Sequence, residues 1–190
     1  MTRKALKEWA LAIKALETGE QILLLRKGGL VEGGGRFNLE AERFFLYPTR
    51  YHQEPNVVKP GYEHLVEAAA SEEPAKGRLR IHLIADAVET VPVTDREAVQ
   101  AVDSHYIWST HYMENRFDWK PESPLFLLLL RVSTLRQAQE IPLLPSYAGC
   151  TSWVDLEEDI QIDGAEPVLD DETFRARVEA VHDVLGVKGL

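Results

Sequence analysis

Residues 78–93, RLRIHLIADAVETVPV, constrain the fold of this chain more than any other segment. Apolar side chains recur at every second position from Leu79 to Ala87, which is the pattern of a β-strand. We expect these odd-numbered residues to share one face, with the even-numbered residues from Arg80 to Val88 on the other. A strand of this length is expected to bend round a barrel.

Other segments show helical or strand periodicity. We expect helices over residues 3–17, 62–70, 94–102 and 171–185, and strands over residues 21–26 and 124–135. Residues 36–49 are ambiguous, because they alternate like a strand but end in an apolar stretch that Pro48 stops. The irregular order of these elements excludes a regular doubly wound sheet. The predicted fold class is α+β, a small mixed β-barrel flanked by N-terminal and C-terminal helices.

The helix ends and the domain division can also be predicted. Thr94 is expected to cap the helix over residues 94–102, with Glu97 completing a capping box. Asp170 or Asp171 should cap the last helix, and Gly186 should end it. We expect one domain over residues 1–165, with residues 166–190 forming a helix packed on it or appended to it.

Composition excludes several classes of protein. The 190 residues include one cysteine, Cys150, so the chain can form neither an internal disulfide nor a zinc site made of cysteines. This fits a reducing compartment, and the expected location is the cytoplasm. The charged start is no signal peptide, and the run FLLLL is too short to span a membrane. We expect no cofactor, no metal and no membrane partner.

The net charge of −10 is unevenly distributed. Residues 1–60 have 10 Lys/Arg and 7 Asp/Glu, whereas residues 61–130 have 6 and 12, and residues 131–190 have 5 and 12. The overall charge argues against a protein that coats nucleic acid through a basic surface. An anionic ligand is expected to bind in the N-terminal third, the only part with a net positive charge.

The segment LLLRKGGLVEGGG, residues 23–35, joins a buried strand to cations and glycines. Arg26, Lys27, Gly28 and Gly29 are candidate ligands for a phosphate or a base carbonyl, because backbone N–H groups in glycine-rich turns bind anions. Arg36, after the second glycine group, is a weaker candidate. The alternative is a hairpin turn with solvated cations. The spacing of a nucleoside-triphosphate loop is absent.

Residues 47–53, YPTRYHQ, form the densest polar cluster. Tyr47, Thr49, Arg50, His52 and Gln53 could stack on a base, pair with a phosphate or read a base edge. If the chain is an enzyme, His52 could act as a general base near Thr49. The alternative is a proline turn packed by aromatic side chains.

Other polar residues carry weaker signals. His111 and Glu114 are three residues apart, but two candidate ligands make a poor metal site. The same segment contributes Arg116 to the candidate binding residues. Ser152 could reach a pocket from a tight turn. His82 is interpreted as a structural histidine within a strand.

Three segments, taken together, resemble the bacterial domain of unknown function 1802 family. They are ALKEWALAIKALETGEQILLLRKGG, FFLYPTRYHQ and YAGCTSWVDL, which together cover about residues 5–160. The family has no established activity. Some members are joined to restriction-endonuclease-like domains, which implies a role in restriction or defence and a nuclease partner protein.

The segment AIKALETGEQILLLRKGG is also similar to the opening of ASCH domains, which belong to the PUA-like barrel superfamily. In that family a helix ends at a glycine, and a short strand then leads to a basic residue at a pocket. The corresponding parts here are residues 5–17, Gly19, residues 21–25 and Arg26–Lys27. The resemblance implies binding of RNA or modified bases, or amidase or ribonuclease activity in a few members.

The leading hypothesis is therefore a nucleic-acid or modified-nucleotide binding domain. The expected site consists of Arg26, Lys27, Gly28, Gly29, Arg36, Tyr47, Thr49, Arg50, His52, Gln53, Arg116 and Ser152. The rival is a small hydrolase, an amidohydrolase or a nuclease, that uses Lys27, Thr49 or His52 with a carboxylate such as Glu40 or Glu42. A third hypothesis is an accessory protein that docks a nuclease.

Overall fold

A seven-stranded sheet with five α-helices makes up the part of the chain that the structure describes. The computed structural model describes residues 2–27, 39–50, 56–72, 74–119, 121, 125–149 and 151–186. In chain order the elements are β1 (Lys4–Trp9), α1 (Ala10–Glu17), β2 (Leu23–Arg26), β3 (Arg43–Thr49), α2 (Glu63–Ser71), β4 (Arg78–Val93), α3 (Arg96–Ala101), η1 (Asp103–His105), α4 (Thr110–Asp118), β5 (Leu125–Pro142), η2 (Pro145–Tyr147), β6 (Trp153–Asp155), β7 (Glu166–Pro167) and α5 (Asp171–Leu185).

The two long antiparallel strands β4 and β5 organise the sheet. They pair from Arg78 opposite Pro142 to Val93 opposite Leu125, with register shifts between Ile81 and Leu83 and between Ala87 and Glu89. The strand order is β2-β5-β4-β3-β1-β6, with β7 added to β5. Among the strand pairs of the described residues, only β1 and β3 run parallel, and the others are antiparallel. The predicted α+β class is confirmed.

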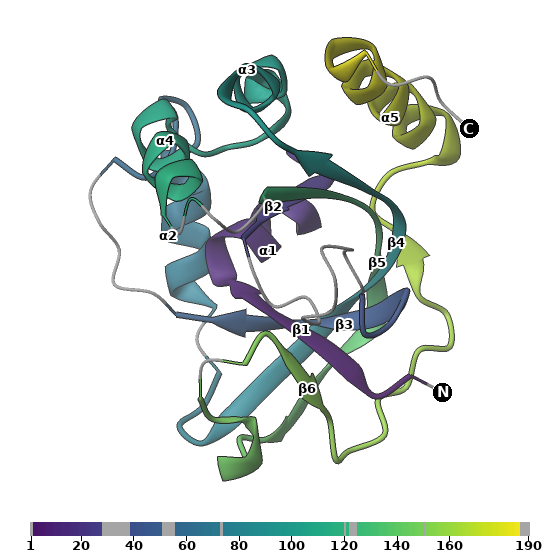
Figure 1. Cartoon of the computed structure of the whole chain (residues 1–190). Helices are drawn as coiled ribbons and strands as arrows, with labels where there is room; N and C mark the ends of the chain where they lie inside the picture. Colours follow the sequence, from purple (N-terminus) through teal and green to yellow (C-terminus); the bar gives the residue numbers. More distant parts are fainter. Residues whose placement is uncertain are drawn as a thin grey trace.

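The sheet curls strongly and α1 lies within the curl (Figure 1). The order nevertheless begins at β2 and ends at β6, and the described strands do not pair these two edges. The closed barrel expected from the sequence is therefore not confirmed. A side chain spans part of the gap: on β2, Arg26 donates to the carbonyl oxygen of Lys7 on β1 at 3.1 Å.

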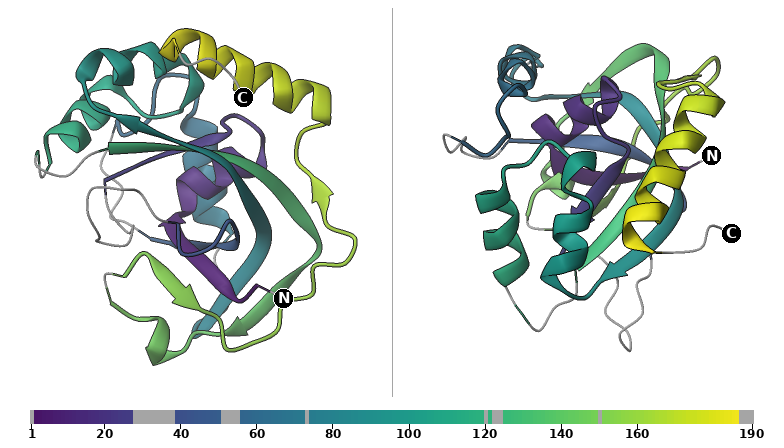
Figure 2. Two further views of the ribbon diagram at one scale, coloured as in Figure 1. Left: turned by 45° about the vertical axis from the view of Figure 1, so that its right-hand side comes forward. Right: turned by 90° about the horizontal axis from the view of Figure 1, so that it is seen from above.

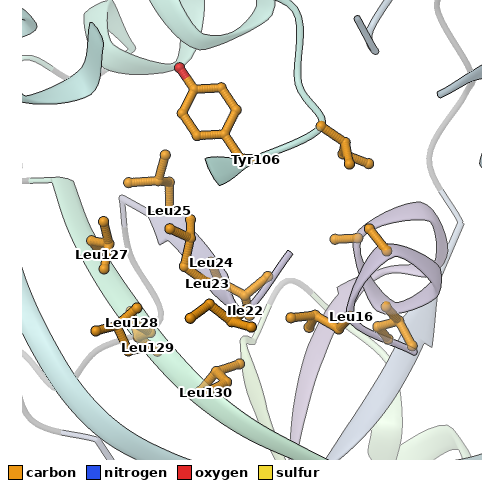
Figure 3. Packing of buried hydrophobic residues seen from close by; sticks show 14 of the residues in the cluster. Leu16, Ile22, Leu23, Leu24, Leu25, Tyr106, Leu127, Leu128, Leu129 and Leu130 are labelled. Carbon is orange, nitrogen blue, oxygen red and sulfur yellow. The ribbon is translucent and has the colours of Figure 1, made fainter. Parts of the chain in front are cut away.

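The curl buries leucine-rich segments from elements far apart in the sequence. All four residues of β2 are buried, and Leu23, Leu24 and Leu25 pair with the leucines of β5. Figure 3 shows Leu16 of α1 facing this group across the core, with Tyr106 above it. Since burying one leucine contributes about 1.5–3 kcal/mol, this packing contributes strongly to the stability of the fold.

The predicted helix over residues 3–17 is wrong for its first half. Residues Lys4–Trp9 form β1, and α1 begins only at Ala10. The strand lies between β3 and β6 and pairs with both, so its backbone groups are satisfied in the sheet. Ala5 and Leu6 are completely buried there. Pairing on two sides overrides the local helical pattern of residues 3–17.

The predicted single apolar face of β4 is also wrong. Leu79 and Ile81 belong to a smaller core cluster, whereas Leu83 and Ala85 belong to the main one. The change occurs at the register shift between Ile81 and Leu83, where the pairing skips His82. A bulge of this kind alters which residues point to each side, so strict alternation fails.

The helix ends were mostly predicted. Asp170 caps α5 by accepting a hydrogen bond from the Thr173 amide, and Gly186 ends the helix with a φ of 64°. The cap of α3 is Asp95 rather than the predicted Thr94, because its side chain accepts from the Ala98 amide.

The elements after residue 165 contact the rest of the chain. Strand β7 pairs with β5, and Val181 of α5 is fully buried in the main core. Figure 2 shows α5 lying beside α3, across the helix-rich side of the molecule. Among the described residues, none of the helices has the length and hydrophobicity needed to cross a membrane.

Candidate functional site

A pocket with a volume of about 430 Å³ lies between α1, α2 and the first half of β4. We call it the α1–β4 pocket. Three of the predicted site residues line it: Tyr47 and Thr49 at the end of β3, and Arg50 directly after it. The remaining walls come from α1, from α2, from residues 72 and 74–77, from the start of β4 and from Leu143.

One end of the pocket contains a cluster of four ionisable side chains, Lys14, Glu17, Glu72 and His82. The Lys14 Nζ lies 2.7 Å from Glu17 Oε2 and also contacts the Glu72 carboxylate. On the other side of Glu17, His82 Nε2 lies 3.3 Å from Oε1. Residues from α1, from the end of α2 and from β4 are thus brought together.

The cluster changes the acidity of its members. Contact with His82 is the largest cause of a lowered pKa at Glu17, about 2, and Lys14 adds to this effect against the opposing effect of burial. Burial alone would lower the pKa of Lys14, but the carboxylates of Glu17 and Glu72 outweigh it and raise that pKa. Glu17 is therefore ionised and Lys14 charged at neutral pH.

His82 is the least satisfied member of the cluster. Only 8% of the residue is exposed, and neither ring nitrogen has a hydrogen-bond partner among the residues that the structure describes. Its contact with Glu17 has the distance of an ion pair without the direction of a hydrogen bond. Because buried polar atoms usually have partners, an imidazole in this state is a candidate for ligand binding.

The pocket has a second, basic side formed by Arg50, Lys76, Arg78 and Arg80. Arg78 donates to the carbonyl oxygen of Glu140, whereas the buried Nε of Arg80 has no partner within the described parts of the chain. The turn that leads into β4 needs Gly77, whose φ is 77°. This turn places three of the four cations within five residues.

The predicted residues of β3 have internal contacts as well as a place on the pocket wall. The Thr49 hydroxyl donates to the carbonyl oxygen of Glu8 at 3.0 Å. The Tyr47 ring packs edge-on against Tyr147 at 6.3 Å, and burial raises the pKa of its phenol. Both side chains can contact a ligand only with part of their surface.

The other predicted cations lie away from the α1–β4 pocket, at the end of β2. Arg26 is buried, forms an ion pair with Glu8 and donates to Ser152 Oγ at 3.1 Å. Lys27 is also buried and donates to the carbonyl oxygens of Phe117 and Trp119. The Nε of Arg116 lies 3.4 Å from the carbonyl oxygen of Leu25. The structure thus brings together Arg26 with Ser152, and Lys27 with the end of α4.

Several predicted residues lie outside the described residues, namely Gly28, Gly29, Arg36, His52, Gln53 and Cys150. Of the two carboxylates proposed for a hydrolase, Glu40 forms an ion pair with Lys4 at 2.9 Å. The backbone oxygen of Glu42 accepts from the Ala87 amide at 2.8 Å. Neither lines the α1–β4 pocket.

The sequence did not reveal the ionisable cluster. Glu17, Glu72 and His82 lie in three elements and form no motif, and His82 was interpreted as a structural residue. Its position on β4 follows from the register shift, which alternation could not predict. The only available signal was the run of basic residues from Lys76 to Arg80, located in a part of the chain with net negative charge.

Comparison with solved structures finds the ASCH protein of Zymomonas mobilis, with 14% identity and a TM-score of 0.46 over 93% of each chain. Two single-residue variants of that protein also match. One has 14% identity and a TM-score of 0.46 over 83% of this chain and 92% of that one. The other has 15% identity and a TM-score of 0.43 over 93% and 94%.

No curated protein sequence matches the chain. The family described as "Domain of unknown function (DUF1802)" matches residues 5–180, which include almost every described element. These residues contain the whole α1–β4 pocket and the cations at the end of β2. The chain belongs to the DUF1802 family.

Proposed function

We propose that the α1–β4 pocket binds a nucleotide-like anion, either a free nucleotide or a single nucleotide unit of a nucleic acid. One observation carries this proposal: five cationic side chains line one pocket of a chain whose net charge is −10. Two of the lining residues, Glu17 and Glu72, are acidic, and both contact Lys14. The five cations outnumber these two carboxylates, so the lining has an excess of positive charge.

The size of the pocket supports a ligand of one nucleotide. Small-molecule sites usually measure about 300–1,000 Å³, and the volume of about 430 Å³ is within that range. An acidic surface repels a long phosphate backbone, so binding is expected to depend on the pocket and to be selective. Tyr47 supplies an aromatic wall that a base can contact.

Arg80 is the lining cation on which the proposal can best be tested, because its buried Nε has no hydrogen-bond partner among the described residues. A guanidinium pairs well with phosphate oxygens, and a charge-assisted hydrogen bond contributes about 1.5–3 kcal/mol. Arg80→Met removes the charge and keeps most of the stem. We expect this variant to bind a nucleotide or oligonucleotide at least about tenfold more weakly than the unaltered chain.

The test is a titration of the full chain with nucleoside monophosphates and labelled single-stranded RNA, single-stranded DNA and duplex DNA, at several salt concentrations. Arg175→Met is the matched control, because Arg175 is an exposed arginine of α5 that does not line the pocket. If Arg80 contacts phosphate, its loss reduces the salt dependence of binding by a slope of about 1. Absence of binding to every probe at low salt would refute the proposal.

The hydrolase hypothesis has less support from the described residues. Thr49 lines the pocket, but Lys27 does not, and the Thr49 hydroxyl donates to a backbone carbonyl. A catalytic nucleophile needs a base within hydrogen-bond reach, and neither Lys27 nor Glu40 supplies it there. A nuclease partner and a link to restriction remain predictions from the family resemblance.

A further inference from the structure

We propose that Glu17, Glu72 and His82 bind a divalent transition-metal ion at the acidic end of the α1–β4 pocket. One ligand atom of each residue can be chosen so that all three lie within 4.8 Å of one another. An ion at the centre of such a triangle is at most about 2.8 Å from each atom, so small side-chain movements suffice to reach the usual 2.0–2.2 Å.

His82 provides an observation that is independent of the two carboxylates. Its side chain is 10% exposed, and both ring nitrogens lie buried without a hydrogen-bond partner in the described parts of the chain. An imidazole in a purely structural role usually donates one N–H and accepts with the other nitrogen. Coordination by one ring nitrogen would satisfy a group that the fold leaves unsatisfied.

The contacts of Lys14 indicate that a positive charge is favourable beside the carboxylates of Glu17 and Glu72. Its ammonium contacts both Glu17 and Glu72, although its own side chain is only 11% exposed. A dication between the same carboxylates would gain the imidazole as a third ligand. The flexible stem of Lys14, which also lines the pocket, can then move its charge toward the open space. Lys14 is therefore a competitor of the metal.

The donor set determines the kind of ion. One imidazole nitrogen and two carboxylate oxygens suit Zn²⁺ or Mn²⁺, whereas Mg²⁺ and Ca²⁺ prefer oxygen ligands alone. Three protein ligands leave a coordination position for water or a ligand in the pocket, which is the arrangement of a catalytic rather than a structural zinc site. The inference does not depend on the nucleotide proposal, because the metal can be titrated alone.

The experiment is a calorimetric titration of the metal-stripped full chain with Zn²⁺, Mn²⁺, Mg²⁺ and Ca²⁺, without nucleotide. His82→Ala and Glu72→Gln each remove one ligand. The second variant is the safer one for folding, because the Glu72 side chain is 36% exposed. Lys14→Met removes the competitor, and His111→Ala removes an exposed histidine of α4 as the matched control. Circular dichroism verifies that each variant is folded.

We expect one equivalent of Zn²⁺ or Mn²⁺ to bind more tightly than Mg²⁺ or Ca²⁺. Affinity should fall by more than about tenfold in Glu72→Gln and His82→Ala, should rise by about tenfold in Lys14→Met, and should be unchanged in His111→Ala. Absence of binding even in Lys14→Met would overturn the inference. So would binding that is insensitive to Glu72→Gln, binding that is lost in His111→Ala, or a preference for Mg²⁺ or Ca²⁺.

Discussion

The end of β2 and the α1–β4 pocket are both rich in charge, but they differ in what their cations contact. At the end of β2, Arg26 and Lys27 are buried and bind groups of the protein itself. In the pocket, neither ring nitrogen of His82 has a hydrogen-bond partner in the described chain, and the same holds for the buried Nε of Arg80. The Nε of Arg26 is also without one, but its two terminal nitrogens donate to other parts of the protein. The first region uses charge to hold elements together, whereas the second contains an imidazole that makes no hydrogen bond with the described residues.

This difference shows why a conspicuous basic motif is a poor guide to a binding site. Residues 26–29 combine two cations with two glycines, and the described half of this motif stabilises the fold. Burial of a cation requires a partner, and inside a protein the partner is usually another part of the chain. The unsatisfied imidazole of His82 lies where no motif marks it.

The largest effect is expected from Arg26→Met. The substitution leaves the Glu8 carboxylate, whose side chain is 11% exposed, without its cation, and it removes the bridge from β2 to β1. Breaking a buried pair costs about 3–5 kcal/mol, so the free energy of unfolding in urea should fall by that amount.

The double variant Arg26→Met with Glu8→Gln sharpens this prediction, because it removes both charges of the pair. It should recover part of the lost stability. If Arg26→Met were as stable as the unaltered chain, the end of β2 would not be a structural region, and Arg26 would again be a candidate ligand-binding residue.

A smaller effect is expected from Lys27→Met. The variant loses hydrogen bonds to the carbonyl oxygens of Phe117 and Trp119, at the C-terminal end of α4, where a cation is favourable. The cost should be about 1.5–3 kcal/mol. Hydrogen exchange should increase in the last turn of α4 and remain unchanged in α5. Faster exchange in both helices would show that Lys27 supports more than the end of α4.

The smallest effect on stability is expected from Arg80→Met. Because the buried Nε has no described partner, removal of this group should change the free energy of unfolding by less than about 1 kcal/mol. Thermal and urea unfolding measure this value. A loss as large as that of Arg26→Met would contradict the comparison, because Arg80 would then also be a structural cation.

Sequence reasoning located the elements whose pattern is local. The extent of α5 and its ends at Asp170 and Gly186 depend on residues within one helix, and these were predicted. By contrast, β1 is a strand because two strands that are distant in the sequence pair with it. The sequence of residues 4–9 does not show which segments they pair with. Local periodicity cannot reveal long-range pairing.

The residues of the candidate site also form two groups, one predictable from a local pattern and one brought together only by the fold. Tyr47, Thr49 and Arg50 were predicted because they form a dense polar cluster within one segment, and they line the pocket. Glu17, Glu72 and His82 come from three segments whose proximity depends on how α1 and α2 lie on the start of β4. Their proximity depends on the tertiary structure, so local sequence patterns could not predict it.

The change of core along β4 has a further consequence for cooperativity. Leu79 and Ile81 pack in the smaller cluster, and Leu83 and Ala85 pack in the larger one, yet all four lie on one continuous strand. Neither cluster can lose its packing without disturbing a strand that the other requires. The two cores should therefore melt in a single transition, with His82 at the point where they are coupled.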